Sequence, residues 1–259
     1  MSCARLSLED TAVLVTRPAS RAAPLCERIR EAGGRPIVLP TIVITPLQPP
    51  AVPAAADIYI FLSPDAVEYG LPFLRSHEIT VNHAMILAVG QATARVLRDA
   101  GISGAETPSG NLASSEGLLA MSCLRAGQVR GRRVLLICGV GGRALLTEKL
   151  HARGARVERL EIYRRDPAES NIVDAIQTAG GGRPDVTVVT SVEGMENLAR
   201  LIHAQGQEWL LAVPLVVMSK RIAAECQCCG FTGTANVAPG ASDDGLIAAL
   251  VEYVDAKKS

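Results

Sequence analysis

Residues 134–160, VLLICGVGGRALLTEKLHARGARVERL, contain the pattern that decides the fold. A short apolar run (Val134–Cys138) precedes a helical pattern (Arg143–Arg153). After Gly154 a second apolar run follows (Val157–Leu160). A glycine directly after a helix suits the left-handed conformation in which many helices end. The order strand, helix, strand predicts the unit from which parallel α/β folds are built.

The same alternation continues along the rest of the chain. Two more helical patterns, Arg21–Ala32 and Gln91–Ala100, are each followed by a glycine. The remaining strand candidates are short and apolar throughout, as expected for strands covered on both faces. They are Ala12–Thr16, Pro36–Leu39, Ile58–Leu62, Met85–Val89, Val186–Thr190 and Leu215–Met218. We therefore expect the α/β class with parallel sheets.

The chain also matches itself. Residues 13–46 align with residues 134–167 at a constant offset of 121. Three shorter matches follow at offsets of 128 or 129: Asp57–Ser63 with Asp185–Ser191, Gly90–Ala94 with Ser219–Ala223, and Ser114–Leu118 with Ser242–Leu246. Repetition of this kind predicts an internal duplication, with two similar lobes and a cleft between them. The proline-rich segment Pro46–Pro53 and the stretch after Pro167 suit linkers, which would let the chain cross between lobes twice.

The charge of the chain is balanced overall but not locally. The 26 basic and 26 acidic residues produce no global field that would favour a nucleic acid or a membrane partner. Between Arg125 and Arg165, however, eleven basic residues stand against three acidic ones, a net charge of +8. This segment has two interpretations: a solvated helix face, or a surface that faces an anionic ligand.

The cysteines and the N-terminus indicate the compartment. The first residues lack the apolar core of a signal peptide, and no stretch is long enough to cross a bilayer. Seven cysteines, an odd number that stands mostly in apolar contexts, favour a reducing cytoplasm. The motif Cys226-Gln-Cys-Cys229 lacks a second ligand pair at zinc-finger spacing, so we expect no metal.

Candidate binding residues follow the predicted strands. Ligands of open parallel sheets bind beyond the carboxyl ends of the strands, where helices begin. Serines there suit helix N-caps, and free backbone N–H groups at several convergent helix starts also form anion sites. The residues at these positions are Arg17, Ser63, Gly90, Arg143, Ser191 and Ser219. Such a set suits a ligand with many carboxylates.

Most conventional catalytic motifs are missing. The chain has no G-x-S-x-G elbow and no Walker-type lysine loop, and its four histidines lack metal spacing. Gly139–Ala144 fits G-x-G-x-x-A after a strand, with Glu158 or Glu161 near the spacing of a ribose partner. Its repeat counterpart, Arg17–Arg21, has no glycine. A dinucleotide-dependent enzyme and a two-lobed binding or sensor protein remain alternatives.

Several stretches together carry a family resemblance through their order and spacing. They are Val15–Pro18, Phe61–Val67, Ala88–Ala94 with Gly101, Ser115–Leu119, Arg132–Ile137, Gly141–Arg143, Tyr163–Arg165, Thr190–Ser191, Asn197–Leu198, Ser219 and Ala241–Asp243. Over nearly its full length, the chain resembles the uroporphyrinogen-III synthase family. The resemblance implies a monomer of two flavodoxin-like parallel-sheet lobes. Residues 1–41 with 168–259 would form one lobe and residues 51–162 the other, joined by a two-stranded ladder of residues 42–50 and 163–167.

The resemblance also implies a reaction. The family cyclises hydroxymethylbilane to uroporphyrinogen III in tetrapyrrole biosynthesis, with inversion of the last ring and loss of water, and without cofactor or metal. Loss of the hydroxyl leaves a cationic azafulvene, and a spiro intermediate then fragments and recloses inverted. The substrate closes by itself without inversion, so the reaction needs confinement and orientation more than a strong base.

Individual roles carry over only by matching positions. Tyr163 matches a cleft tyrosine that would assist departure of the hydroxyl by hydrogen bonding. Thr93, after Gly90, matches a cleft-facing threonine, whereas Lys220–Ile222 offers no hydroxyl at the repeat counterpart. Asp65 stands where relatives often have asparagine, which puts that contact in doubt. The residues implied to hold acetate and propionate groups are Arg17, Ser63, Arg143, Ser191 and Ser219.

Overall fold

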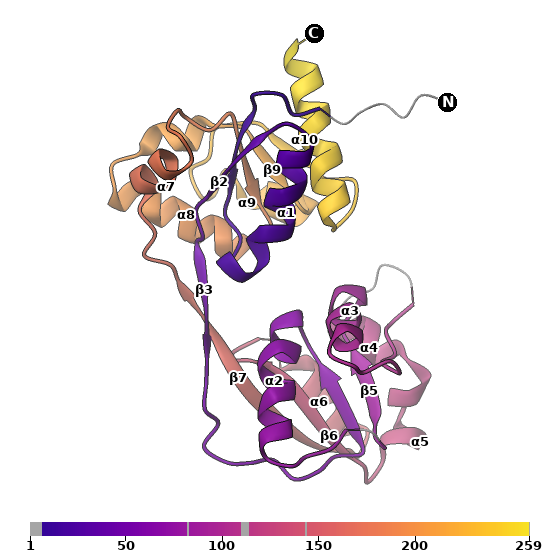
Figure 1. Ribbon diagram of the computed structural model, residues 1–259. Helices are drawn as coiled ribbons and strands as arrows, with labels where there is room; N and C mark the ends of the chain where they lie inside the picture. The colour runs from indigo at the N-terminus through magenta and orange to yellow at the C-terminus, as the bar shows by residue number, and fades with distance from the viewer. Residues whose placement is uncertain (1–6, 82, 110–113, 143, 259) are drawn as a thin grey trace. The chain divides into compact units, whose positions relative to one another are not determined.

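The computed structural model describes residues 7–81, 83–109, 114–142 and 144–258 (Figure 1). The chain divides into two compact units: unit 1 is Met1–Val43 with Asp166–Ser259, and unit 2 is Ile44–Arg165. The division falls at Val43/Ile44 and at Arg165/Asp166, within the segments expected to form the connecting ladder. Unit 1 is therefore built from two separate parts of the chain.

Unit 1 is a parallel sheet with helices on both faces. Its strands are β1 (Ala12–Val15), β2 (Arg35–Val38), β8 (Val186–Val189), β9 (Leu215–Val217) and β10 (Ala235–Val237). Its helices are α1 (Ala19–Glu31), α7 (Ile172–Thr178), α8 (Val192–Ala204), η2 (Glu208–Ala212), α9 (Lys220–Glu225) and α10 (Asp243–Lys258). The strand order β2-β1-β8-β9-β10 is the flavodoxin order, and all these pairings are parallel.

Burial on both faces explains why the strands of unit 1 are apolar throughout. Val13 and Val15 pack in one core cluster with residues of α1 and α10. Ala12 and Leu14 belong to the opposite cluster, with residues of α7, α8 and α9. Since successive side chains of a strand point to opposite faces, every position of β1 is buried.

Unit 2 has the same layered construction. Its sheet contains β3 (Ile42–Pro46), β4 (Ile58–Phe61), β5 (Met85–Ala88), β6 (Arg133–Gly139) and β7 (Arg156–Pro167), in the order β3-β7-β6-β4-β5. The unit boundaries fall inside β3 and β7, so Ile42 itself belongs to unit 1. Its helices are α2 (Pro64–Ser76), α3 (Gln91–Asp99), α4 (Ser115–Ala120), η1 (Ser122–Leu124), α5 (Ala126–Val129) and α6 (Leu145–Ala152). One face of the sheet packs with α2 and α3, and the other with α4 and α6. The β4–β5, β4–β6 and β6–β7 pairings are parallel.

The strands matched by the sequence repeat occupy equivalent places in the two sheets. The order β2-β1-β8-β9 in unit 1 corresponds to β7-β6-β4-β5 in unit 2. In unit 1, β2 and β1 come from the first copy of the repeat, and β8 and β9 come from the second. In unit 2, β7 and β6 come from the second copy, and β4 and β5 come from the first. Each unit therefore combines parts of both copies, although the duplication itself stays a prediction.

The predicted parallel α/β class is confirmed. All eight predicted strands are present, and β7 extends beyond the predicted Val157–Leu160 to Pro167. The short edge strand β10 was not predicted. The helix predicted from Arg143 begins at Leu145, and Arg143 itself lies outside the described residues. Gly33 and Gly154 have φ values of 87° and 86°, the left-handed conformation expected after a helix.

No helix in the described part of the chain combines the length and the apolar character needed to span a bilayer.

A buried amide holds together the two chain segments that enter and leave unit 1. The Thr41 carbonyl accepts a hydrogen bond from the Ala168 N–H at 3.1 Å and from Asn197 Nδ2 of α8 at 2.9 Å. Thr41 is fully buried, and Asn197 is 3% exposed. Asn197 thus ties α8 to the segment at Thr41, and the same carbonyl joins that segment to Ala168.

Asn197→Ala should lower the free energy of unfolding by about 1 to 3 kcal/mol, because the buried Thr41 carbonyl loses a partner that water cannot replace. Urea unfolding followed by circular dichroism measures the change. Gln177→Ala, which removes an exposed amide of α7 in the same unit, is the matched control and should change it by less than about 0.5 kcal/mol. Equal effects of the two substitutions would contradict the role of Asn197.

Candidate active site at the carboxyl edge of unit 2

Parallel pairing brings the carboxyl ends of β4, β5 and β6 to one edge of the unit 2 sheet. Ser63 and Gly90 follow β4 and β5 and are the N-caps of α2 and α3. Gly139 ends β6, and Tyr163 lies beside it on β7. Ser63 and Gly139 therefore lie beside the phenol of Tyr163 at this edge.

The central contact joins two of the predicted site residues. The Ser63 Oγ lies 3.0 Å from the Tyr163 hydroxyl oxygen. The same Oγ accepts a hydrogen bond from the Ala66 N–H at 2.9 Å, which caps α2. A serine hydroxyl has two lone pairs and one proton, so it can serve the cap and the phenol at once.

Burial keeps the Tyr163 phenol protonated. Tyr163 is 4% exposed, and its removal from water raises its pKa above the usual value of 10.0. The Ser63 hydrogen bond and the Arg165 charge lower the pKa, but less than burial raises it. At neutral pH the group is therefore a phenol that can donate a hydrogen bond, not a phenolate.

An arginine and an aspartate flank the phenol. The Arg165 guanidinium lies 5.8 Å from the centre of the Tyr163 ring, and 3.9 Å from an Asp65 carboxylate oxygen in the first turn of α2. The Asp65 side chain is 10% exposed, whereas that of Arg165 is 46% exposed. The guanidinium therefore carries a positive charge beside the phenol while remaining open to solvent.

The predicted site residues of unit 1 form hydrogen bonds within that unit. Arg17 Nη1 donates to the Asp243 carboxylate of α10 at 2.6 Å, so an internal ion pair occupies part of the guanidinium. Ser191 Oγ accepts from the Gly194 N–H at 3.0 Å, and Ser219 Oγ accepts from the Ile222 N–H at 3.3 Å. Both serines are helix N-caps, as their positions after strands suggested.

The other predicted residues lie apart from the tyrosine–serine contact. Thr93 lies in the first turn of α3 with a side chain only 1% exposed, and Gly90 before it is also buried. Arg143 is outside the described residues. The sequence singled out Gly139 only as the start of the G-x-G-x-x-A motif, and Arg165 only as the end of the stretch Tyr163–Arg165; neither was predicted to be a site residue.

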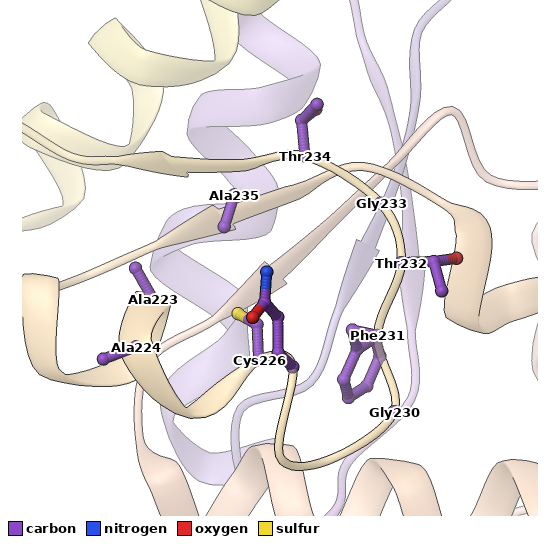
Figure 2. Close-up of a pocket in the computed structure, with 10 residues that line it drawn as sticks. Ala223, Ala224, Cys226, Gly230, Phe231, Thr232, Gly233, Thr234 and Ala235 are labelled. Carbon is purple, nitrogen blue, oxygen red and sulfur yellow. The ribbon is translucent and has the colours of Figure 1, made fainter.

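A separate cavity lies in unit 1. A pocket of about 740 Å³ in unit 1 is formed by the end of α9, the following turn and the start of β10 (Figure 2). Its lining includes Cys226, Phe231 and Ala235. Ala235 begins β10, so the pocket lies toward the amino edge of the parallel sheet, whereas Ser219 lies beyond its carboxyl edge. This cavity is therefore not part of the candidate site.

The described residues form no group of side chains that could bind a metal ion. Within residues 7–81, 83–109, 114–142 and 144–258, no three His, Cys, Asp or Glu side chains are grouped to hold a metal ion. Cys226 donates its thiol to the Ile222 carbonyl at 3.5 Å, which is a structural role.

Sequence comparison decides the family. A family model described as "Uroporphyrinogen-III synthase HemD" matches residues 23–248. The chain belongs to the uroporphyrinogen-III synthase family. The predicted family is thus confirmed, and it replaces the dinucleotide and sensor alternatives. In keeping with this, Glu158 lies within β7 and not at the end of a strand.

Relatives and solved structures agree with the family assignment. The uroporphyrinogen-III synthase of Escherichia coli K12 is 30% identical over 249 residues, covering 92% of this chain and 99% of the relative. That of Salmonella typhimurium is 29% identical, with the same coverage. The uroporphyrinogen-III synthetase structure from Helicobacter pylori has a TM-score of 0.59 at 12% identity, covering 95% of this chain and 99% of that one. A mutant synthase structure from Thermus thermophilus has a TM-score of 0.58 at 17% identity, covering 96% and 99%, so the family fold is shared.

Cys138, next to Gly139, should make stability depend on alkaline pH. Burial raises the pKa of its thiol from 9.0 to about 11. The folded chain therefore holds this proton more tightly than the unfolded chain, and the resulting stability is present below pH 9 and lost as pH rises through 11. The free energy of unfolding should fall by up to about 2 to 3 kcal/mol over this range from Cys138 alone.

Cys138→Ala should flatten this pH dependence, as measured by urea unfolding at pH 8 to 11. The control is Cys228→Ala, because Cys228 is exposed and free. The same slope in Cys138→Ala as in the unsubstituted chain would contradict the assignment.

Proposed function

We propose that this chain converts hydroxymethylbilane to uroporphyrinogen III, with inversion of the last ring and loss of water, and that Tyr163 assists departure of the hydroxyl. The observation that supports this most directly is the 3.0 Å contact between the Tyr163 hydroxyl and Ser63 Oγ at the carboxyl edge of unit 2. The Tyr163 phenol of this chain therefore lies at the edge of the sheet where parallel α/β folds bind their ligands.

The hydrogen-bond directions allow the Tyr163 hydroxyl to donate a hydrogen bond to the substrate. The Ala66 N–H points at Ser63 Oγ, which leaves the serine proton free to point at the Tyr163 oxygen. In that arrangement the Tyr163 proton is directed away from Ser63, toward the departing hydroxyl of the substrate. A chain of donors that starts at a helix N-terminus also stabilises negative charge that develops on the phenol oxygen.

The reaction neither consumes nor releases a net proton. The hydroxyl departs with one proton as water, and the carbon–oxygen bond electrons leave with it, so the pyrrole chain becomes a cationic azafulvene. The last ring then attacks through its substituted carbon, and the spiro intermediate fragments and recloses. Loss of a proton from the newly joined ring restores aromaticity and returns the proton that left with the water. No oxidant, reductant, cofactor or metal is needed for these steps.

The substrate's carboxylates also need partners. Arg165 fits this role in unit 2 because its guanidinium is half-exposed, lies beside Tyr163, and meets Asp65 only at 3.9 Å. In unit 1, Arg17 has further N–H groups besides the one that binds Asp243, and Ser191 and Ser219 each precede a helix N-terminus.

The proposal includes the compartment and the assembly state. We place the chain in the cytoplasm as a monomer that acts on a small molecule. The six cysteines among the described residues are all free thiols, which supports a reducing compartment.

Tyr163→Phe should lower the rate of type III product formation by roughly 100-fold, the size expected for loss of one positioned donor. The assay supplies freshly generated hydroxymethylbilane and resolves type III product from the spontaneous type I product. Tyr59→Phe is the matched control, because this buried tyrosine of unit 2 accepts a hydrogen bond from the Ala56 N–H at the amino end of β4.

No rise in type III product with the unsubstituted chain would reject the proposed activity and favour a non-catalytic binding protein. Wild-type turnover in Tyr163→Phe would instead reject only the role of the phenol.

Arg165→Gln should raise KM for hydroxymethylbilane by about 3- to 10-fold and leave kcat close to that of the unsubstituted chain, because a half-exposed guanidinium contributes mainly to carboxylate binding. Steady-state kinetics at fixed ionic strength measure the two constants. The control is Arg156→Gln, at the exposed start of the same strand. A fall in kcat at constant KM would contradict a binding role.

A further inference from the structure

We propose that Gly139 is a positioning residue: its missing side chain makes room for the Tyr163 ring and thereby places the phenol on Ser63. This inference rests on the proposed function for its effect on catalysis, but its geometric content stands by itself. Gly139 contacts no substrate in this proposal and acts only through Tyr163.

The register of β6 and β7 shifts at this point. Cys138 pairs with Glu161, but Gly139 pairs with Tyr163, so Ile162 is an extra residue in β7. Strand neighbours normally point to opposite faces, yet Ile162 and Tyr163 both belong to the core cluster on the α2 and α3 side. The shift therefore turns Tyr163 toward the face where Ser63 caps α2.

The ring then lies directly against Gly139. A Cβ at Gly139 would be 2.7 Å from both Cε2 and Cζ of Tyr163, and 3.1 Å from its hydroxyl oxygen. The Val140 N–H donates to the Tyr163 carbonyl at 2.8 Å, which fixes the backbone of the tyrosine beside Gly139. Any added methyl group must therefore displace the ring, and with it the hydroxyl held by Ser63.

The backbone gives no other reason for glycine at this position. Gly141 and Gly142 have φ values of 79° and 82°, which favour glycine for conformational reasons. Gly139 does not share that conformation and is the last residue of β6. Space, and not backbone freedom, is what glycine supplies at residue 139.

The repeat provides an internal comparison. At the offset of 121, Gly139 corresponds to Pro18, and Tyr163 corresponds to Ile42. Unit 1 thus lacks both the tyrosine and the glycine at the matching positions. Glycine and tyrosine occur together, as expected if the first makes room for the second.

Kinetics test whether Gly139 acts through Tyr163. Gly139→Ala should lower kcat for type III formation by about 100-fold, to the level of Tyr163→Phe, with KM within about 2-fold of the unsubstituted value. The double variant should be no slower than Tyr163→Phe alone, because both changes remove the same contribution. The control Gly104→Ala, where an added Cβ meets nothing within 4 Å, should keep full kcat. A double variant at least tenfold slower than Tyr163→Phe, or wild-type kcat in Gly139→Ala, would overturn the proposal.

A spectroscopic measurement separates this inference from the proposed function. With ¹³Cζ-labelled tyrosine, the four tyrosines give four NMR signals, and Tyr163→Phe identifies the one from Tyr163. Gly139→Ala should shift that signal, whereas Gly104→Ala should shift none. An unmoved Tyr163 signal overturns the positioning role. A shifted signal in a chain without type III activity supports the positioning role while rejecting the proposed reaction.

A steric rescue covers the case in which Gly139→Ala does not fold. Adding Tyr163→Leu removes the ring that the new methyl group would meet, so the pair should recover the thermal transition. Continued failure to fold would show that Gly139 is needed for another reason and would overturn the proposal.

Discussion

Burial of both faces of two parallel sheets is the constraint on which the rest of this structure depends. Most of the apolar strands are followed by a helix that returns over one face, and these helices begin at the carboxyl edge of a sheet, whereas β2 leads directly into β3. Four of these helices begin after a serine whose hydroxyl accepts a backbone N–H: Ser63, Ser191, Ser219 and Ser242. Packing of the core thus collects hydroxyl groups and helix N-termini at the edges where ligands of such sheets bind.

The two units share this construction but not its chemistry. Ser63 and Ser191 are matched by the repeat, and both cap a helix. Ser63 also contacts a phenol, whereas the position matching Tyr163 in unit 1 is Ile42, a buried aliphatic residue. Ser191 is therefore only a helix cap, whereas Ser63 also forms a candidate catalytic pair with Tyr163. The two positions differ by the register shift in β7 and by tyrosine in place of isoleucine.

The candidate site depends on burial more than on strong acids and bases. Removal from water keeps Tyr163 and its neighbour Cys138 protonated, so neither group is a ready nucleophile at neutral pH. The charge beside the phenol, Arg165, is half-exposed and lies near Asp65. This arrangement suits a reaction whose difficulty is orientation of a flexible, polyanionic chain.

The sequence by itself determined the α/β class, most of the strands, the helix-ending glycines and the family, because apolar periodicity and motif order are local or collinear properties. It also pointed to Ser63 and Tyr163 separately. Only the tertiary structure decided that they touch, that Arg17 already binds Asp243, and that Gly139 lies against the phenol ring. These facts depend on which strands are neighbours and on a one-residue shift between them. Pairing over a hundred residues of separation leaves no local pattern in the chain.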